Sequence, residues 1–314
     1  MKLLNITFFF RLAGLALLIF IVSKIGLNKL FSCLLNVEPL YIFIVLLLNF
    51  FLVFSKALRW NSILKLQKID ITTLNSYIIY YRGAFLGVSS PGSIGEFIKA
   101  FYLKNEFNTP LTKGLLSVFI DRLIDLYILI ILAIVGLWKF MVPDKYSIVS
   151  IILVIVMTTA PLTLTHKFFI KKYSRVLYLM LCKNFKLLKF HDFYQEMEYF
   201  FNPKLIITLL LSCLGFIIFF IQCYLLTLGM NIQIDFITIT LFMSITRLVS
   251  IIPISISGLG TRDAILIYLF SLINLTSELA VSYSFLIFIV CYVFNGIVGA
   301  CVWIVKPLSM DKSM

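Results

Sequence analysis

The chain has 314 residues and a net charge of +13; 61% of its residues are hydrophobic, 13% are charged, and its mean hydropathy is +1.06. Soluble domains are about half apolar and about a quarter charged. The composition therefore excludes an ordinary soluble domain and predicts an all-α polytopic membrane protein, with residues 1–314 forming one integral membrane domain. In such a chain a basic excess is expected to face the anionic lipids of the inner leaflet, and no nucleic-acid partner is expected.

Apolar windows long enough to cross about 30 Å of hydrocarbon predict six full spans. They are expected at 4–23, 40–58, 114–137, 147–165, 205–228 and 280–305. The first window is interpreted as a retained span rather than a signal peptide, because Arg11 interrupts it and it lacks a clear small-x-small cleavage site. Lys and Arg are concentrated in the segments that face inward when the N-terminus is cytoplasmic. Both termini are therefore expected in the cytoplasm.

Two shorter and more polar regions, 71–104 and 236–273, lie between these windows. Each contains a break rich in Gly and Pro, and irregular backbone at membrane depth persists only where it is buried in protein or lines a wet cavity. The break residues are Pro91, Gly92, Gly95, Pro253, Gly258 and Gly260. We expect two broken hairpins that enter from opposite sides, as an inverted repeat around a transporter site would produce. Alternatively, Gly and Pro only kink two ordinary spans.

The segment 166–204 differs from the rest of the chain. Apolar residues recur in it at helical spacing among many lysines, which is typical of a basic helix on the inner membrane surface. The same pattern also fits a solvated linker between two bundles. Its histidines, His166 and His191, are the only two in the chain, and the six cysteines show no C-x-x-C spacing. We therefore expect no metal site and no cofactor.

Ionisable side chains inside the bilayer cost a few kcal/mol or more each, so they need a partner or a function. Arg122 and Asp125 are i,i+3 neighbours and are expected to pair. Asp121 is then the less fully compensated acid and could pair with Arg82 or Arg247 from another helix. The candidates for substrate binding or translocation are Arg82, Glu96, Asp121, Arg122, Asp125, Arg247, Arg262 and Asp263.

Three of these positions allow a second interpretation. Glu96 either caps a helix N-terminus or forms the floor of a cavity. Arg262, at the start of a half-helix, is expected to hold an anion together with backbone N–H groups, unless Asp263 neutralises it. Arg59 and Trp60 end the second window and are interpreted as interfacial anchors rather than a substrate site.

In this order and spacing, the motifs resemble the transmembrane domain of lysylphosphatidylglycerol synthases, the flippase-like domain family. The resemblance covers the chain from about Arg59 to Val305 and rests on Arg59-Trp60 and on segments 91–96, 121–125 and 253–263. Family members usually carry Glu at the positions of Asp121 and Asp263. Aminoacyl-transferring members have a soluble catalytic domain after the membrane part, and this chain stops at Met314, so synthase activity is not expected.

The resemblance implies movement of a polar-headed lipid between leaflets. We expect a plasma-membrane translocase, not an enzyme, whose substrate is a membrane phospholipid or a polyprenyl-linked lipid. Arg262 and Arg247 are expected to meet the lipid phosphate, while Glu96, Asp121 and Asp125 contact a cationic head group or exchange protons. Two alternatives stay open: an intramembrane lipid transferase with Glu96 or Asp121 as its base, and a non-catalytic partner of a synthase or glycosyltransferase.

Overall fold

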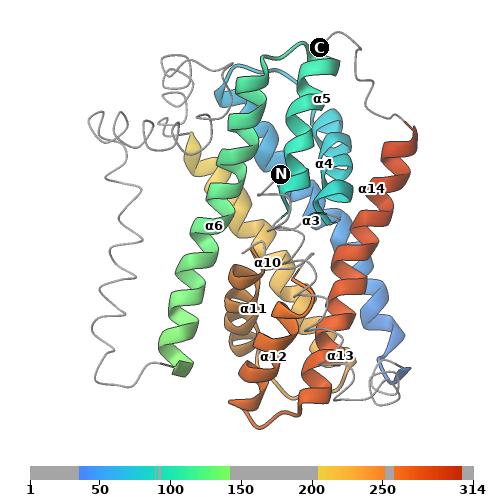
Figure 1. Ribbon diagram of the computed structural model, residues 1–314, viewed down its shortest axis with the longest axis vertical. Coiled ribbons are helices and arrows are strands. Elements are labelled where there is room, and N and C mark those ends of the chain that lie inside the picture. The colour runs from blue at the N-terminus through green and yellow to red at the C-terminus, as the bar shows by residue number, and fades with distance from the viewer. Residues whose placement is uncertain (1–34, 89, 91–92, 142–203, 252–257, 306–314) are drawn as a thin grey trace, which may run out of the picture.

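The computed structural model describes residues 35–88, 90, 93–141, 204–251 and 258–305, and all regular structure in these ranges is helical (Figure 1). The elements are α3 (Pro39–Leu66), α4 (Thr73–Val88), the 3₁₀-helix η1 (Ile94–Phe97), α5 (Ile98–Phe107), α6 (Leu111–Met141), α10 (Leu205–Gly229), α11 (Phe236–Ser250), α12 (Thr261–Ser271), α13 (Ser277–Ile287), the π-helix η3 (Phe288–Val293) and α14 (Phe294–Val305). The prediction of an all-helical chain is therefore confirmed for the described part.

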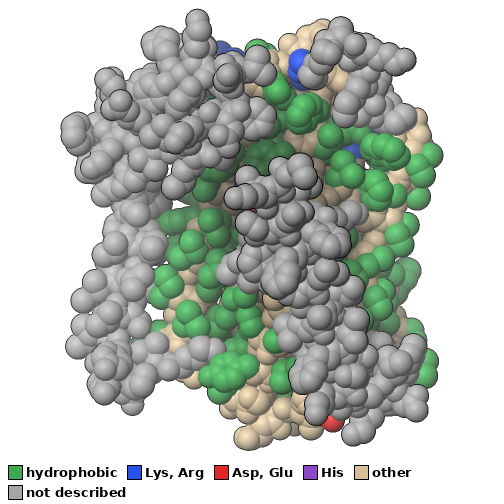
Figure 2. Space-filling view, viewed as in Figure 1, with side chains coloured by type: hydrophobic (Ala, Val, Ile, Leu, Met, Phe, Trp, Pro, Cys, Tyr) green, Lys and Arg blue, Asp and Glu red, His purple; other side chains and the backbone are tan. Residues whose placement is uncertain are grey.

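Three described segments are long and apolar enough to cross a membrane: Pro39–Leu66, Leu205–Gly229 and the continuous run Ser277–Val305. They contain the windows predicted at 40–58, 205–228 and 280–305, and the window at 114–137 lies within α6. Figure 2 shows hydrophobic side chains over much of the described surface between the two ends of the molecule. The windows at 4–23 and 147–165 and the basic segment 166–204 lie outside the described residues, apart from Lys204, so the count of six spans stays a prediction.

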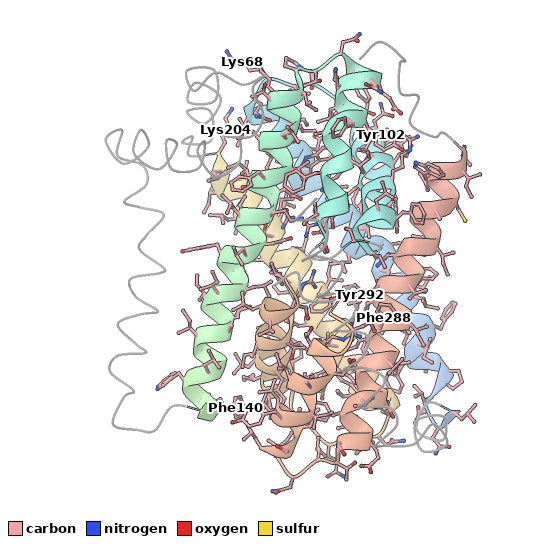
Figure 3. All side chains as sticks on the ribbon, in the orientation of Figure 1. Lys68, Tyr102, Phe140, Lys204, Phe288 and Tyr292 are labelled. Atoms are coloured by element: carbon pink, nitrogen blue, oxygen red, sulfur yellow. The ribbon has the colours of Figure 1, made fainter. Side chains whose placement is uncertain are left out.

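The two broken regions form short helix pairs that run in opposite directions. In Figure 1, α4 and α5 extend from one end of the molecule to its middle, whereas α11 and α12 extend from the other end to the middle. Figure 3 identifies these ends: Lys68 and Lys204 lie at the first and Phe140 at the second. We call the α4–α5 pair the first hairpin and the α11–α12 pair the second hairpin.

The described backbone of the first break is satisfied by its own residues, as burial at membrane depth requires. Ser93 adopts a left-handed conformation with φ 56°, and Ser90 Oγ accepts a 2.7 Å hydrogen bond from Gly95 N. Glycine is required at position 95 because a Cβ atom there would overlap the backbone of Leu86. Pro91 and Gly92 lie outside the described residues.

The second break uses glycine conformations that other residues rarely adopt. Gly258 and Gly260 have φ values of 78° and 83°, which carry no steric penalty only for glycine. The carboxylate of Asp263 accepts a 2.8 Å hydrogen bond from Gly260 N and so caps α12. Pro253 lies outside the described residues.

Aromatic and aliphatic side chains form separate cores on either side of the molecule's middle. One core packs α10, α11, α12 and α13 together around Phe219, Phe242 and Phe270. The other joins α3 to the first hairpin around Trp60 and Tyr80. Four of the seven buried charged residues in the described ranges, Arg59, Lys99, Asp121 and Asp125, are joined by ion pairs between α3, α5 and α6.

Candidate functional site

Six charged side chains of alternating sign form a continuous chain of ion pairs, which we call the charge ladder. Its members, in order, are Arg122, Glu96, Lys99, Asp121, Arg59 and Asp125. They come from η1 and α5 of the first hairpin, from α6 and from α3. Three cations and three acids balance within this set.

The end of the ladder on α3 is the most deeply buried part. Arg59 Nε donates to Asp121 Oδ1 at 2.7 Å, and its two Nη atoms bind both oxygens of Asp125. The side chains of Arg59 and Asp121 are 1% and 0% exposed. Asp121 and Asp125 meet the same guanidinium because residues at i and i+4 share one face of a helix. A forked pair of this kind is the strongest form of carboxylate binding by arginine.

Lys99 joins the first hairpin to α6. Its Nζ lies 3.2 Å from Glu96 Oε2 and 3.4 Å from Asp121 Oδ2, and the side chain is 0% exposed. The ammonium also lies 4.0 Å from the centre of the Tyr80 ring and 5.3 Å from that of Trp60. The aromatic faces compensate part of the cost of burying this cation.

Small residues on α4 allow the side chains of Glu96 and Lys99 to pack against this helix. A Cβ atom at Gly83 would come within 2.7 Å of Lys99 Cγ, and one at Gly87 within 2.8 Å of Glu96 Cγ. The spacing of these two glycines is the small-xxx-small pattern that permits close helix packing in membranes.

The interpretation of Arg59 and Trp60 as interfacial anchors is wrong. Both side chains are buried, and Trp60 Nε1 donates to Ser117 Oγ at 3.1 Å. The apolar window ends at residue 58, but α3 continues to Leu66 because it packs against the first hairpin rather than ending at the membrane surface.

The predicted partners of Arg122 and Asp121 are also wrong, because both side chains pair with residues of other helices. Arg122 pairs with Glu96 rather than with Asp125. Arg82 lies outside the ladder and pairs with Glu106 at 2.7 Å. Asp121 therefore binds Arg59 and Lys99 instead of Arg82 or Arg247. All three acids that were expected to meet a cationic head group are engaged by cations of the protein.

A cavity adjoins the Arg59–Asp125 end of the ladder, between α3, α6, α10 and α11. It has room for about one water molecule, and its lining residues are Lys56, Arg59, Asp125, Ser212, Gly215, Phe216, Phe219 and Arg247. Of the predicted site residues, it brings together Asp125 and Arg247. Sequence reasoning missed Lys56, although a lysine inside the window 40–58 is itself a charge at membrane depth.

Arg262 and Asp263 form a separate buried group at the start of α12. Arg262 Nε donates to Ser284 Oγ at 2.8 Å, and the Ser284 hydroxyl donates to Asp263. The Arg262 guanidinium lies over the rings of Phe288 and Tyr292, which Figure 3 labels. Its two Nη atoms have no hydrogen-bond partner among the described residues. Asp263 is therefore connected to Arg262 through the Ser284 hydroxyl. Its carboxylate also occupies the N-terminus of α12, where backbone N–H groups were expected to hold an anion.

No group of three His, Cys, Asp or Glu side chains within the described ranges is arranged to hold a metal ion. The chemistry that the described site offers is electrostatic, namely paired charges that can separate and unpaired cations that can bind anions.

Comparison with known proteins places the chain in a family. A UPF0104 membrane protein of Methanocaldococcus jannaschii is 25% identical over 99% of this chain and 96% of its own length. No solved structure matches the chain. The family described as the lysylphosphatidylglycerol synthase TM region matches residues 3–299. The resemblance of the motifs is thereby confirmed, and the chain belongs to the membrane-protein family of the lysylphosphatidylglycerol synthase TM region.

Proposed function

We propose that the chain is a flippase-like translocase that moves a polar-headed phospholipid or a lipid-linked precursor between membrane leaflets. The observation that carries this proposal is the charge ladder, which holds the first hairpin to α3 and α6 inside an otherwise apolar bundle. A buried ion pair is weak evidence for stability, because packed apolar residues often stabilise a core as well or better. Ionisable residues inside a membrane protein more commonly mark a substrate path.

The ladder supplies a physical basis for alternating access. In the state described, every ladder charge has a partner, and separating one buried pair costs about 3–5 kcal/mol. Water and a polar head group entering between the first hairpin and α6 can offset this cost by replacing the lost partners. Under this proposal the two oppositely directed hairpins belong to an inverted repeat, and transport proceeds by rocking one half against the other.

The remaining parts of the proposal concern location and energy. We place the protein in the cell membrane with both termini in the cytoplasm, on the basis of the Lys and Arg distribution. The sequence contains no G-x-x-x-x-G-K-[ST] motif for binding ATP phosphates. Transport is therefore proposed to be ion-coupled or downhill.

Purified protein in liposomes with head-group-labelled lipids tests the proposal. The measured quantity is the rate at which label becomes accessible to an impermeant reagent. Wild type is expected to accelerate exposure, and Glu96→Gln or Arg122→Ala to reduce the rate at least about tenfold, because each removes one partner of the same ion pair. Glu278→Gln is the matched control, since it makes the same chemical change in the first turn of α13.

Equal rates for empty liposomes and folded wild type, with every lipid tested, would refute translocation. If activity appeared only with a co-purified synthase or glycosyltransferase, the chain would instead be a non-catalytic partner. Conversion of a labelled lipid into a new chemical species would identify a transferase.

A further inference from the structure

We propose that the cavity beside the charge ladder binds the phosphate of an anionic lipid, and that the head group it accepts carries no ammonium group. This inference rests on the proposed function, because it names the substrate class for the same path. It follows from the basic side chains that line the cavity and from the hydrogen-bond donors they leave unused.

The cavity is lined by three basic side chains and one acid. The ladder pairs three acids with three cations, and the cavity adds Lys56 and Arg247. Neither of these two side chains lies within ion-pairing distance of a carboxylate in the part of the chain that the structure describes. The ladder and the cavity together therefore contain five basic groups and three acids, and two basic groups at one end of the ladder have no acid of their own.

The two surplus cations are held on different helices. Lys56 is three residues before Arg59 on α3, which places both on one helix face. Arg247 lies near the tip of the second hairpin, with its guanidinium 4.4 Å from the ring centre of Phe219 and 5.7 Å from that of Phe216. The rings stabilise the charge of Arg247 without accepting in-plane hydrogen bonds, so its N–H donors stay available to an anion.

These groups match the chemistry of a phosphate. Arginine offers a planar fork to phosphate oxygens and lysine a compact charge. Ser212 Oγ accepts a 3.0 Å hydrogen bond from Arg59, so its own hydroxyl proton is available to another phosphate oxygen. Asp125, the acid of the cavity, already binds Arg59 through both oxygens. An ammonium group would therefore meet no unpaired carboxylate at this site.

The cavity is small in the described state. It has room for about one water molecule, so a phosphate would enter as the lining helices move apart. A phosphate between Lys56 and Arg247 would also connect α3 with the second hairpin. A lysylated head group, which carries two ammonium groups, is disfavoured by charge.

Transport of four lipids with identical acyl chains tests the inference: phosphatidic acid, phosphatidylglycerol, phosphatidylcholine and lysyl-phosphatidylglycerol. Wild type in liposomes is expected to move the first two at least about tenfold faster than the last two. Lys56→Gln and Arg247→Gln are each expected to lower the faster rates about tenfold or more, as loss of a charged hydrogen-bonding partner does. Lys56→Arg should retain the preference. Lys139→Gln is the matched control, since this lysine lies on α6 beside Phe140, outside the cavity.

Each variant is first shown to be monodisperse and folded in detergent, and its melting temperature is then measured with phosphatidic acid and with inorganic phosphate. Equal transport of all four lipids, unchanged by Lys56→Gln and Arg247→Gln, would overturn the substrate class and leave translocation intact. No transport, together with stabilisation by phosphatidic acid that both variants lose, would support the anion site and refute translocation. Stabilisation by inorganic phosphate but not by phosphatidic acid would assign the site to a free anion and overturn the lipid inference.

Discussion

Replacing Arg59 with glutamine is expected to lower the free energy of unfolding by about 3–5 kcal/mol, the usual cost of leaving a buried charge unpaired. The side chain is 1% exposed and pairs with two acids of α6. After the substitution, Asp121 keeps the Lys99 ammonium at 3.4 Å. Asp125 loses its only ion-pair partner among the described residues. Most of the expected loss therefore comes from Asp125.

A double-mutant cycle isolates this contribution. Asp125→Asn alone leaves Arg59 with Asp121, so it is expected to cost less than Arg59→Gln. Combining the two substitutions removes the cation and the acid that depends on it, and the double variant should be more stable than the sum of the single effects predicts. Coupling of about 0.5–3 kcal/mol is typical for residues in contact. The quantity to measure is the free energy of unfolding in detergent micelles, by denaturant titration.

A small effect would refute this reasoning. If Arg59→Gln cost less than about 1 kcal/mol, as is usual for exposed ion pairs, Arg59 would lie at the membrane surface and the buried pair would not exist. Arg59→Lys provides a second check, because lysine keeps the charge and loses the forked geometry. Its stability is expected to fall between those of wild type and Arg59→Gln.

Two further predictions concern the second hairpin. Ser284→Ala should lower the free energy of unfolding by about 1–3 kcal/mol, because it removes a hydroxyl partner from both Arg262 and Asp263. Thermal unfolding measures this effect, and an unchanged melting temperature would contradict the hydrogen bonds through Ser284. Asp235→Ala should cost about 1 kcal/mol at pH 7 through loss of the α11 N-cap. Hydrogen bonds from the Thr238 side chain and its backbone N–H lower the pKa of Asp235. Its stabilisation is therefore fully present above the unfolded pKa of about 3.9, and the difference from wild type should shrink as pH falls through the lowered folded pKa. A difference that stayed constant down to pH 2 would contradict this role.

The sequence was sufficient to predict the helical class and the two broken regions. The glycines at positions 258 and 260 have φ values that other residues rarely adopt, so their positions in the sequence were enough to locate that turn. The family resemblance rested on short motifs whose order along the chain is visible without a structure. These features are local, and local patterns are what sequence periodicity and turn chemistry report.

Partner choice in the ladder could not be predicted in the same way. Spacing predicted that Arg122 pairs with Asp125, but successive residues of a helix point about 100° apart. Asp121 and Asp125 face α3, whereas Arg122 is turned toward the first hairpin and meets Glu96. Which helix lies against each face is a tertiary property that the spacing within one helix does not contain.

Lys99 shows a second limit of sequence reasoning. It lies between apolar windows, yet its side chain is fully buried beside Tyr80 and Trp60. Counting rules assign each cation between apolar windows to a loop. In a broken hairpin the second helix begins inside the bundle, so a lysine near the start of that helix is buried within the membrane. The glycines at positions 83 and 87 were the available signal, because they allow the returning arm to pack closely.

The distribution of unpaired cations distinguishes the two hairpins. The first hairpin is held to the bundle by ion pairs of Glu96 and Lys99. The second hairpin carries Arg247, which contacts aromatic faces, and Arg262, whose Nη atoms have no hydrogen-bond partner in the described ranges. Unpaired cations in a membrane interior are costly, so they are more readily explained by a ligand that arrives than by the packing that surrounds them. Under the proposed function, an anionic head group would pair with the cations of the second hairpin, as the protein's own acids pair with the cations of the first. The ladder and the lipid phosphate would then stabilise different arrangements of the same bundle, which is the condition for a ligand to shift a conformational equilibrium.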